Sequence, residues 1–152
     1  MELRTRIDKL LAKILITIMA VMVVNVLWQV FSRYFIGMPS SFTDELARYL
    51  MIWVGVLGAA YVSGRNAHVA IDVLPSKLNE GGQKKLRLIV RILIILFSIT
   101  ALVIGGARLV YITYVLDQYS PALQMPLALV YAVIPISGIL IIYYKISDIL
   151  TN

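Results

Sequence analysis

The sequence predicts an all-α membrane protein with four transmembrane helices and both termini in the cytoplasm. Hydrophobic residues make up 61% of its 152 residues and charged residues only 14%, and the mean hydropathy is +0.88. A soluble domain has about 25% charged residues, and a chain of this length cannot bury so much apolar surface in one aqueous core. Four separate apolar segments, each long enough to cross a bilayer as a helix, lead to the same prediction.

Each apolar segment is expected to form one helix of a single transmembrane domain covering residues 1–152. The segments lack the alternating pattern of transmembrane strands and are nearly twice as long as such strands need to be. The third is longer than the bilayer is thick, so its helix should tilt or project into the cytoplasm. Pro135 should bend the fourth. The expected helices cover residues about 11–35, 44–64, 84–117 and 126–146.

Lys and Arg residues are distributed unequally between the ends of these segments. Eleven of the 14 lie in the N-terminal arm, in the connection between the second and third segments, or at the C-terminal end. Connections rich in Lys and Arg remain on the cytoplasmic side of a membrane. Both termini and the second connection are therefore expected in the cytoplasm.

The second connection contains a short amphipathic stretch at residues 66–75. Its apolar residues, among them Val69, Ile71 and Leu74, mix with polar ones without a single regular period, and Pro75 ends it. Such a stretch lies in the membrane interface with its apolar side chains partly among the acyl chains. We expect a short interfacial segment here, in which His68 and Asp72, four positions apart, form a structural pair.

The densest group of polar residues lies where the first helix ends and the second begins. Asp44 and Glu45 are expected in the first turn of the second helix, which Thr43 would cap. Arg48 lies three or four positions beyond these carboxylates, and Arg33 approaches from the first helix. The favoured interpretation is a clamp between helices or a subunit contact. A proton or ion relay is the alternative, because ionisable groups within membranes are often functional.

Asn25 and Gln29 lie four positions apart on one face of the first helix. Two amides at this spacing can line an ion path, but in membrane helices they more often form hydrogen bonds to a neighbouring helix. We expect such an interhelical contact.

The composition gives no sign of a cofactor or of catalysis. The chain has no cysteine, which excludes disulfides, thiolate metal sites and thiol nucleophiles. His68 is the only histidine, so it cannot supply both axial ligands of a haem or build a zinc site. The basic residues are not interleaved with aromatic ones, and nucleic acid is not an expected partner.

Four features that follow one another along the chain resemble a known family. The first helix ends in SRY, at Arg33 and Tyr34. The second opens with DELARY, ending in Arg48 and Tyr49, and continues through Trp53 to LGA. The motif H-x-x-x-D and a fourth helix containing proline (MPLALVYAVIP) come next. Over nearly the full length, this order resembles the small, DctQ-like membrane subunit of tripartite ATP-independent periplasmic (TRAP) transporters.

The resemblance implies a scaffold subunit in the bacterial inner membrane. TRAP systems import organic acids such as C4-dicarboxylates or sialic acid, driven by a sodium gradient. A separate large membrane subunit and a periplasmic binding protein would be its partners. The small subunit would bind no substrate, metal or cofactor. The resemblance makes nine residues candidates for ordering the structure or contacting other subunits: Arg33, Tyr34, Asp44, Glu45, Arg48, Tyr49, Trp53, His68 and Asp72.

Two other functions stay open at this level. A self-sufficient small exporter would need an ionisable residue deep within a helix, and residues 49–63, 92–107 and 127–144 contain none. A membrane-anchor subunit of a redox complex would commonly hold a haem, which His68 alone cannot ligate on both sides. The sequence does not identify the organic acid.

Overall fold

The computed structural model describes residues 2–37, 40–65 and 80–150, which are mainly helical. Four helical segments in these ranges are long and apolar enough to cross a membrane: Arg4–Ile36, Ser41–Gly64, Gly82–Val115 and Leu127–Leu150. This confirms the predicted class of an all-α membrane protein with four spanning helices. The expected interfacial segment at 66–75, with His68 and Asp72, lies outside the described residues.

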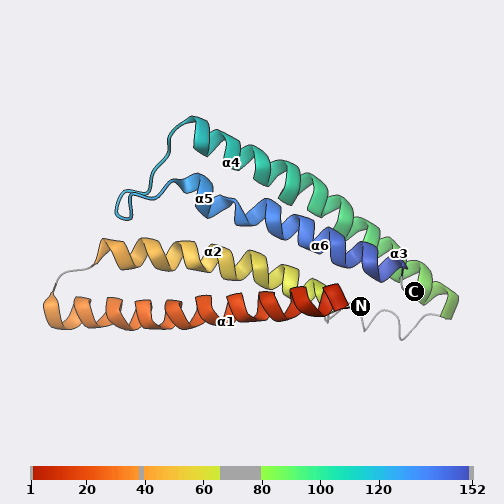
Figure 1. Cartoon of the computed structure of the whole chain (residues 1–152), viewed down its shortest axis with the longest axis horizontal. Helices are drawn as coiled ribbons and strands as arrows, with labels where there is room; N and C mark the ends of the chain where they lie inside the picture. Colours follow the sequence, from red (N-terminus) through yellow and green to blue (C-terminus); the bar gives the residue numbers. More distant parts are fainter. Residues whose placement is uncertain (1, 38–39, 66–79, 151–152) are drawn as a thin grey trace.

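The first two helices form a hairpin. Helix α1 covers Glu2–Phe31 and continues as a π-helical turn, η1, over Ser32–Ile36. Gly37 then ends the helix with φ at 71°, a left-handed conformation that glycine adopts without a steric penalty. Helix α2 covers Ser41–Gly64 and runs back along α1 (Figure 1).

The N-cap of α2 corrects one expectation from the sequence. Ser40, not Thr43, occupies the cap position in extended conformation, and its side chain accepts a hydrogen bond of 3.5 Å from the Thr43 N–H. The Thr43 hydroxyl donates back to the Ser40 carbonyl at 2.9 Å. Both residue types are good caps, but only Ser40 has the non-helical backbone that the position requires. The helix therefore begins before the expected boundary near residue 44.

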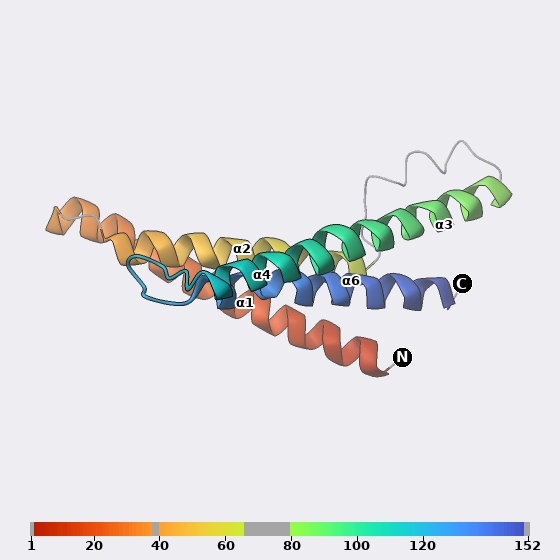
Figure 2. The same ribbon diagram turned by 90° about the horizontal axis from the view of Figure 1, so that it is seen from above.

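The third span is one long helix with an altered middle. It consists of α3 (Glu80–Phe97), a π-helical stretch η4 (Ser98–Gly105) and α4 (Gly106–Val115). Its apolar part, Gly82–Val115, has 34 residues and rises about 50 Å, against about 30 Å for the hydrocarbon core of a bilayer. Figure 2 shows α3 diverging from α6 and α1 at the end that holds the chain termini.

The fourth span is interrupted near its start. Helix α5 covers Leu127–Tyr131, and helix α6 covers Val133–Leu150 after a break at Ala132. Pro135 lies in the first turn of α6 and has no N–H to donate to the carbonyl of Tyr131, four residues earlier. Pro135 is therefore the physical reason for the interruption.

The spans lie side by side in the order α1, α2, α6 and then the third span. Helix α2 packs against both α1 and α6, while α6 also packs against α3 and η4 (Figure 1). Both chain termini lie at one end, which we call the terminal end. The opposite end, with residues 32–37, 40–45 and 116–127, is called the hairpin end.

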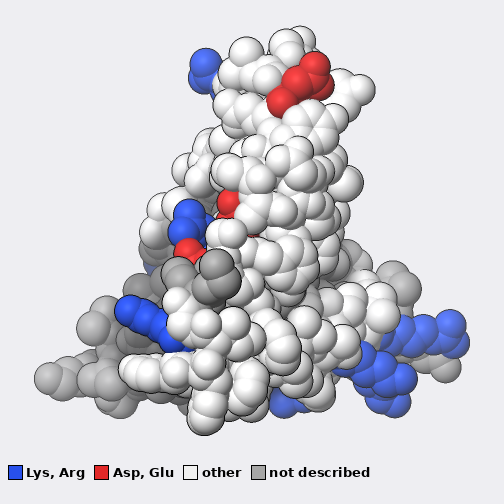
Figure 3. All heavy atoms as spheres, turned by 90° about the vertical axis from the view of Figure 1, so that its left-hand side faces the viewer, with Lys and Arg blue, Asp and Glu red and all other residues white. Residues whose placement is uncertain are grey.

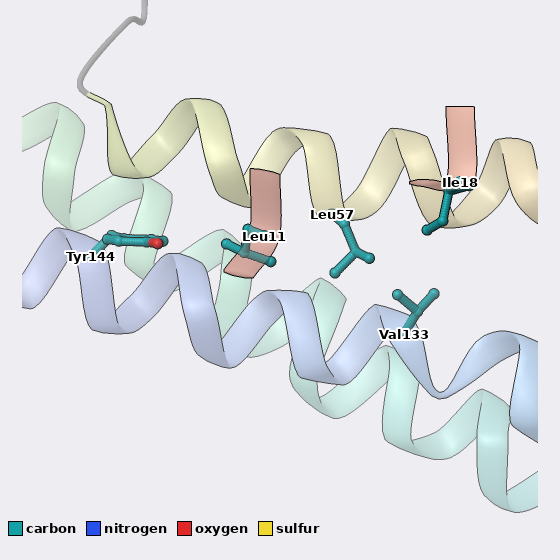
Figure 4. Packing of buried hydrophobic residues seen from close by; sticks show 5 residues of the cluster. All are labelled: Leu11, Ile18, Leu57, Val133 and Tyr144. Carbon is teal, nitrogen blue, oxygen red and sulfur yellow. The ribbon is translucent and has the colours of Figure 1, made fainter. Parts of the chain in front are cut away.

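The apolar core is small and lies where α1, α2 and α6 meet. Figure 4 shows its five buried side chains converging from these helices: Leu11, Ile18, Leu57, Val133 and Tyr144. Most other large apolar side chains are exposed on the outside of the helices, among them Val24, Leu27 and Phe97. Such surfaces need lipid or another membrane protein to cover them.

Candidate functional site

At the hairpin end, Glu45 anchors the connection between the third and fourth spans. Its Oε2 atom accepts hydrogen bonds from the N–H groups of Ala122 and Leu123, at 3.1 and 3.2 Å, and from the hydroxyl of Ser120. Ser120 is fully buried beneath this contact. Hydrogen bonds to an ionised carboxylate are stronger than those between neutral groups, so several of them hold the donor groups firmly in place. Glu45 therefore joins the start of α2 to a segment about 75 residues further along the chain.

The anchored connection is also ordered by its own backbone. The N–H of Ser120 donates to the carbonyl of Met125, and the N–H of Leu127 donates to the carbonyl of Gln118, each at 2.9 Å. The N–H of Gln124 donates to the carbonyl of Ser120, also at 2.9 Å. These bonds leave a compact loop rather than an extended one. At the hairpin end, the loop before α5 is thus held in one compact conformation.

The other carboxylate of this region, Asp44, faces away from the loop. It pairs with Arg48 at 3.4 Å and accepts a hydrogen bond of 3.1 Å from the amide of Gln29 on α1. Asp44 and Arg48 are both well exposed, and pairs of this kind contribute little to stability. The expected cluster of four charges is thus divided, with Glu45 bound to the loop and Asp44 facing outward.

Two amides of α1 join it to α2, as the sequence predicted. Asn25 is buried, and its side-chain N–H donates to the carbonyl of Thr43 at 2.8 Å. Gln29, one turn later, forms the bond to Asp44. Both side chains serve a contact between helices.

The remaining predicted residues do not gather at one point. Arg33 and Tyr34 lie exposed on η1, and Tyr49 is half-buried on α2. The indole N–H of Trp53 donates to the carbonyl of Val130 at 3.0 Å and so joins α2 to α5. Figure 3, which looks onto the hairpin end, shows the charged side chains as a few separate groups on a largely uncharged surface.

Replacing Glu45 with glutamine is expected to loosen the anchored loop. The amide keeps one acceptor but loses the charge that strengthens all three bonds. Hydrogen exchange should therefore speed up several-fold at the amides of Ala122 and Leu123. The neighbouring Asp44→Asn variant is the matched control and should leave these amides unchanged. Unchanged exchange rates at these two amides in the Glu45→Gln variant would show that the loop keeps its structure without the carboxylate.

At the terminal end, a buried ionic group joins the helices. Lys145 and Asp148 on α6 are only 2% and 3% exposed, and their charged atoms lie 3.7 Å apart. Arg4 of α1 pairs with Asp148 at 2.8 Å. Lys145 also donates to the carbonyl of Ser63, near the end of α2, at 3.0 Å. Buried charges persist when they are paired and hydrogen-bonded, as these are.

Further contacts extend this group to all four spans. Tyr144 donates its hydroxyl proton to Asp8 of α1, and its ring lies against the backbone of Gly64. The guanidinium of Arg4 lies 5.6 Å from the centre of that ring and donates to the Gly64 carbonyl. Arg91 of α3 donates to the backbone carbonyl of Asp148 at 2.9 Å. We call the eight residues of this region the terminal network: Arg4, Asp8, Ser63, Gly64, Arg91, Tyr144, Lys145 and Asp148.

The terminal network was not predicted from the sequence, because its basic residues were interpreted only as signals of membrane orientation. One signal was available: Lys145 and Asp148 stand three positions apart near the end of an otherwise apolar helix. Arg4 and Asp8, four positions apart, likewise share one face of α1. Pairs at such spacing in membrane helices usually have a structural or functional partner. Among the described residues, no group of His, Asp and Glu side chains is placed to hold a metal ion.

Four spanning helices, apolar midsections and polar contacts at both ends define a small multi-pass membrane protein. Comparison with protein families gives its identity. The model of the DctQ component of tripartite ATP-independent periplasmic transporters matches residues 22–152. The chain therefore belongs to the DctQ family of TRAP transporter small permease subunits. These subunits are transporter components and not enzymes.

Individual relatives agree with the family. A putative TRAP transporter small permease protein of Haemophilus influenzae is 32% identical over 146 residues, covering 96% of this chain and 89% of the relative. The ectoine TRAP transporter small permease protein TeaB of Halomonas elongata is 28% identical, covering 95% and 77%. The sialic acid TRAP transporter small permease protein SiaQ of Vibrio cholerae is 32% identical over 104 residues, covering 68% and 60%.

Proposed function

We propose that this chain is the scaffold subunit of a sodium-driven TRAP importer for an organic acid. A separate large membrane subunit would carry the substrate, and a periplasmic binding protein would deliver it. The chain would lie in the bacterial inner membrane with its terminal end in the cytoplasm. The excess of Lys and Arg at that end supports this orientation.

The observation that carries the proposal is where the ionisable groups lie and what they do. Residues 49–63, 92–107 and 127–144 contain no Asp, Glu, Lys or Arg. A carrier binds its substrate and coupling ion near the middle of the membrane, with polar groups or broken helices there. Here the carboxylates of Glu45 and Asp148, near opposite ends, hold helices and a loop of the same chain together. Such an arrangement favours a rigid support over a transport path.

The exposed apolar surface supports a partner within the membrane. An apolar hollow of about 500 Å³ lies between the halves of α1 and α2 that are nearer the hairpin end, and its walls include Val24, Trp28, Phe42 and Leu46. Trp28 is 53% exposed there, although Trp is a large apolar side chain. Side chains of a helix from the large subunit would fill such a surface.

The substrate class is part of the proposal and is not determined by this chain. One relative is named for ectoine and another for sialic acid. Different substrates within one family of small subunits support the view that the other components select the substrate. We propose a carboxylate, such as a C4-dicarboxylate, sialic acid or a similar acid.

Reconstitution of the three components in proteoliposomes tests the proposal. A periplasmic binding protein is expected among the neighbouring genes. It would first be screened for stabilisation by ectoine, sialic acid and C4-dicarboxylates, and the acid that binds would be used for uptake. Sodium-dependent uptake is expected only when both membrane subunits and the binding protein are present. Uptake by this chain alone would overturn the scaffold role, and full uptake without it would show that it is dispensable.

A further inference from the structure

A basic hollow at the terminal end shares only Arg91 with the terminal network. It lies between α3 and α6 and has a volume of about 280 Å³. Among the described residues, three cationic side chains and two apolar ones form its walls and no carboxylate does: Lys84, Arg87, Leu88, Arg91 and Ile149. This lining suits an anionic group attached to an apolar one.

The lining residues of α3 occupy one helical face. Positions 84, 87, 88 and 91 follow the spacing i, i+3, i+4 and i+7, which brings side chains to the same side of a helix. Arg91 is held in place because it donates to the carbonyl of Asp148 at 2.9 Å. The carboxylate of Asp148 pairs with Arg4 and Lys145, so two other cations already balance its charge.

The depth of the hollow in a membrane follows from the sequence of α3. Arg91 directly precedes the uncharged run 92–107 and therefore marks the edge of the hydrocarbon core. Arg87 and Lys84 lie about 6 and 10 Å further along the helix axis. The headgroup layer on each side of a bilayer is about 5–8 Å thick. Arg87 and Lys84 are thus placed in and just beyond the layer that contains lipid phosphates.

We propose that this hollow binds the phosphate of an anionic phospholipid. Lys84, Arg87 and Arg91 surround the phosphate, while Leu88 and Ile149 lie against the first part of an acyl chain. The lipid links α3 to α6 at the end where Figure 2 shows these helices diverging. The two apolar walls and the depth favour a lipid over a soluble phosphate. The site does not depend on the proposed transport role, and it would form on whichever side the terminal end lies.

Lipid binding to the full-length chain in detergent tests this site. Native mass spectrometry would compare phosphatidylglycerol with phosphatidylcholine of the same acyl chains, and thermal unfolding would compare both with inorganic phosphate. Phosphatidylglycerol should bind at least about tenfold more tightly than phosphatidylcholine. Inorganic phosphate at the same concentration should not raise the unfolding temperature. Equal binding of the two lipids, or equal stabilisation by inorganic phosphate, would overturn the proposal.

Charge variants locate the binding to the hollow. The double variant Lys84→Gln with Arg87→Gln should lose about tenfold or more in affinity for phosphatidylglycerol. Arg91 is kept because it also contacts α6. Lys85→Gln is the matched control for Lys84→Gln alone, since each removes one charge from the same helix turn and Lys85 lies outside the hollow. Lys84→Gln alone should give an intermediate loss. If Lys85→Gln lost as much affinity for phosphatidylglycerol as Lys84→Gln, only the general positive charge of α3 would attract the lipid.

Discussion

The Asp148→Asn variant is expected to lose about 3–5 kcal/mol of its free energy of unfolding. Asp148 and Lys145 are buried in the terminal network, and the substitution leaves the ammonium group of Lys145 there without a counter-charge. The substitution also removes the negative charge that pairs with Arg4. The free energy can be measured on the purified chain in detergent, with helix content followed by circular dichroism during titration with a denaturing detergent.

Asp117→Asn provides the matched control for this variant. Asp117 is exposed in the loop at the hairpin end, with φ at 45°. Asparagine tolerates this left-handed conformation as well as aspartate does. The control should therefore change stability little. A similarly small effect of Asp148→Asn would contradict the importance of the buried pair.

A second substitution separates the loss of an ion pair from a general disturbance of the fold. Lys145→Met removes the buried ammonium and keeps a long apolar side chain. Combined with Asp148→Asn, it should restore part of the lost stability, because neither buried charge is then left without the other. Effects that simply add would show that the two side chains act independently.

The Gly138→Ala variant is expected to lose about 1–3 kcal/mol because it overfills the contact between α6 and η4. A Cβ atom at this position would lie 2.7 Å from the Cβ of Leu102 and 3.3 Å from the backbone nitrogen of Val103. Neither atom belongs to the flexible end of a side chain, so the two helices themselves would have to move apart. The same detergent titration measures the loss.

Gly55→Ala is the matched control for Gly138→Ala. No atom lies within 4 Å of a Cβ built on Gly55, so the added methyl meets open space. Alanine also favours the helix, and the stability should stay the same or rise by up to about 1 kcal/mol. Equal losses in both variants would mean that the effect comes from the helix backbone and not from the contact.

The ties at both ends have a consequence for the proposed scaffold. Glu45 joins α2 to the loop before α5, and the terminal network joins α1, α2, α3 and α6. A layer of helices fixed at both ends resists bending although its apolar core is small. This stiffness suits a subunit that holds a moving partner in place.

Two features at the start of α2, its N-cap and the partners of its two carboxylates, could not be predicted from the adjacent residues alone. Ser40 and Thr43 are both common caps, and only the folded backbone shows that Ser40 has the extended conformation of the cap position. Asp44 and Glu45 are adjacent, so their side chains point about 100° apart around the helix. Arg48 can reach either carboxylate, and the position of the loop before α5 decided that Glu45 meets Ser120 while Asp44 pairs with Arg48.

The class of the protein and its four spans could be predicted from the sequence, because long apolar runs must become helices in lipid, where every backbone polar group needs an internal partner. The order of its motifs indicated the family. Which charges are paired at the terminal end depended on the packing of the helices. Arg4 and Asp148 are 144 positions apart, and Lys145 meets Ser63 across 82. Contacts over such distances depend on the order and tilt of packed helices, and the local pattern of the sequence does not encode these directly.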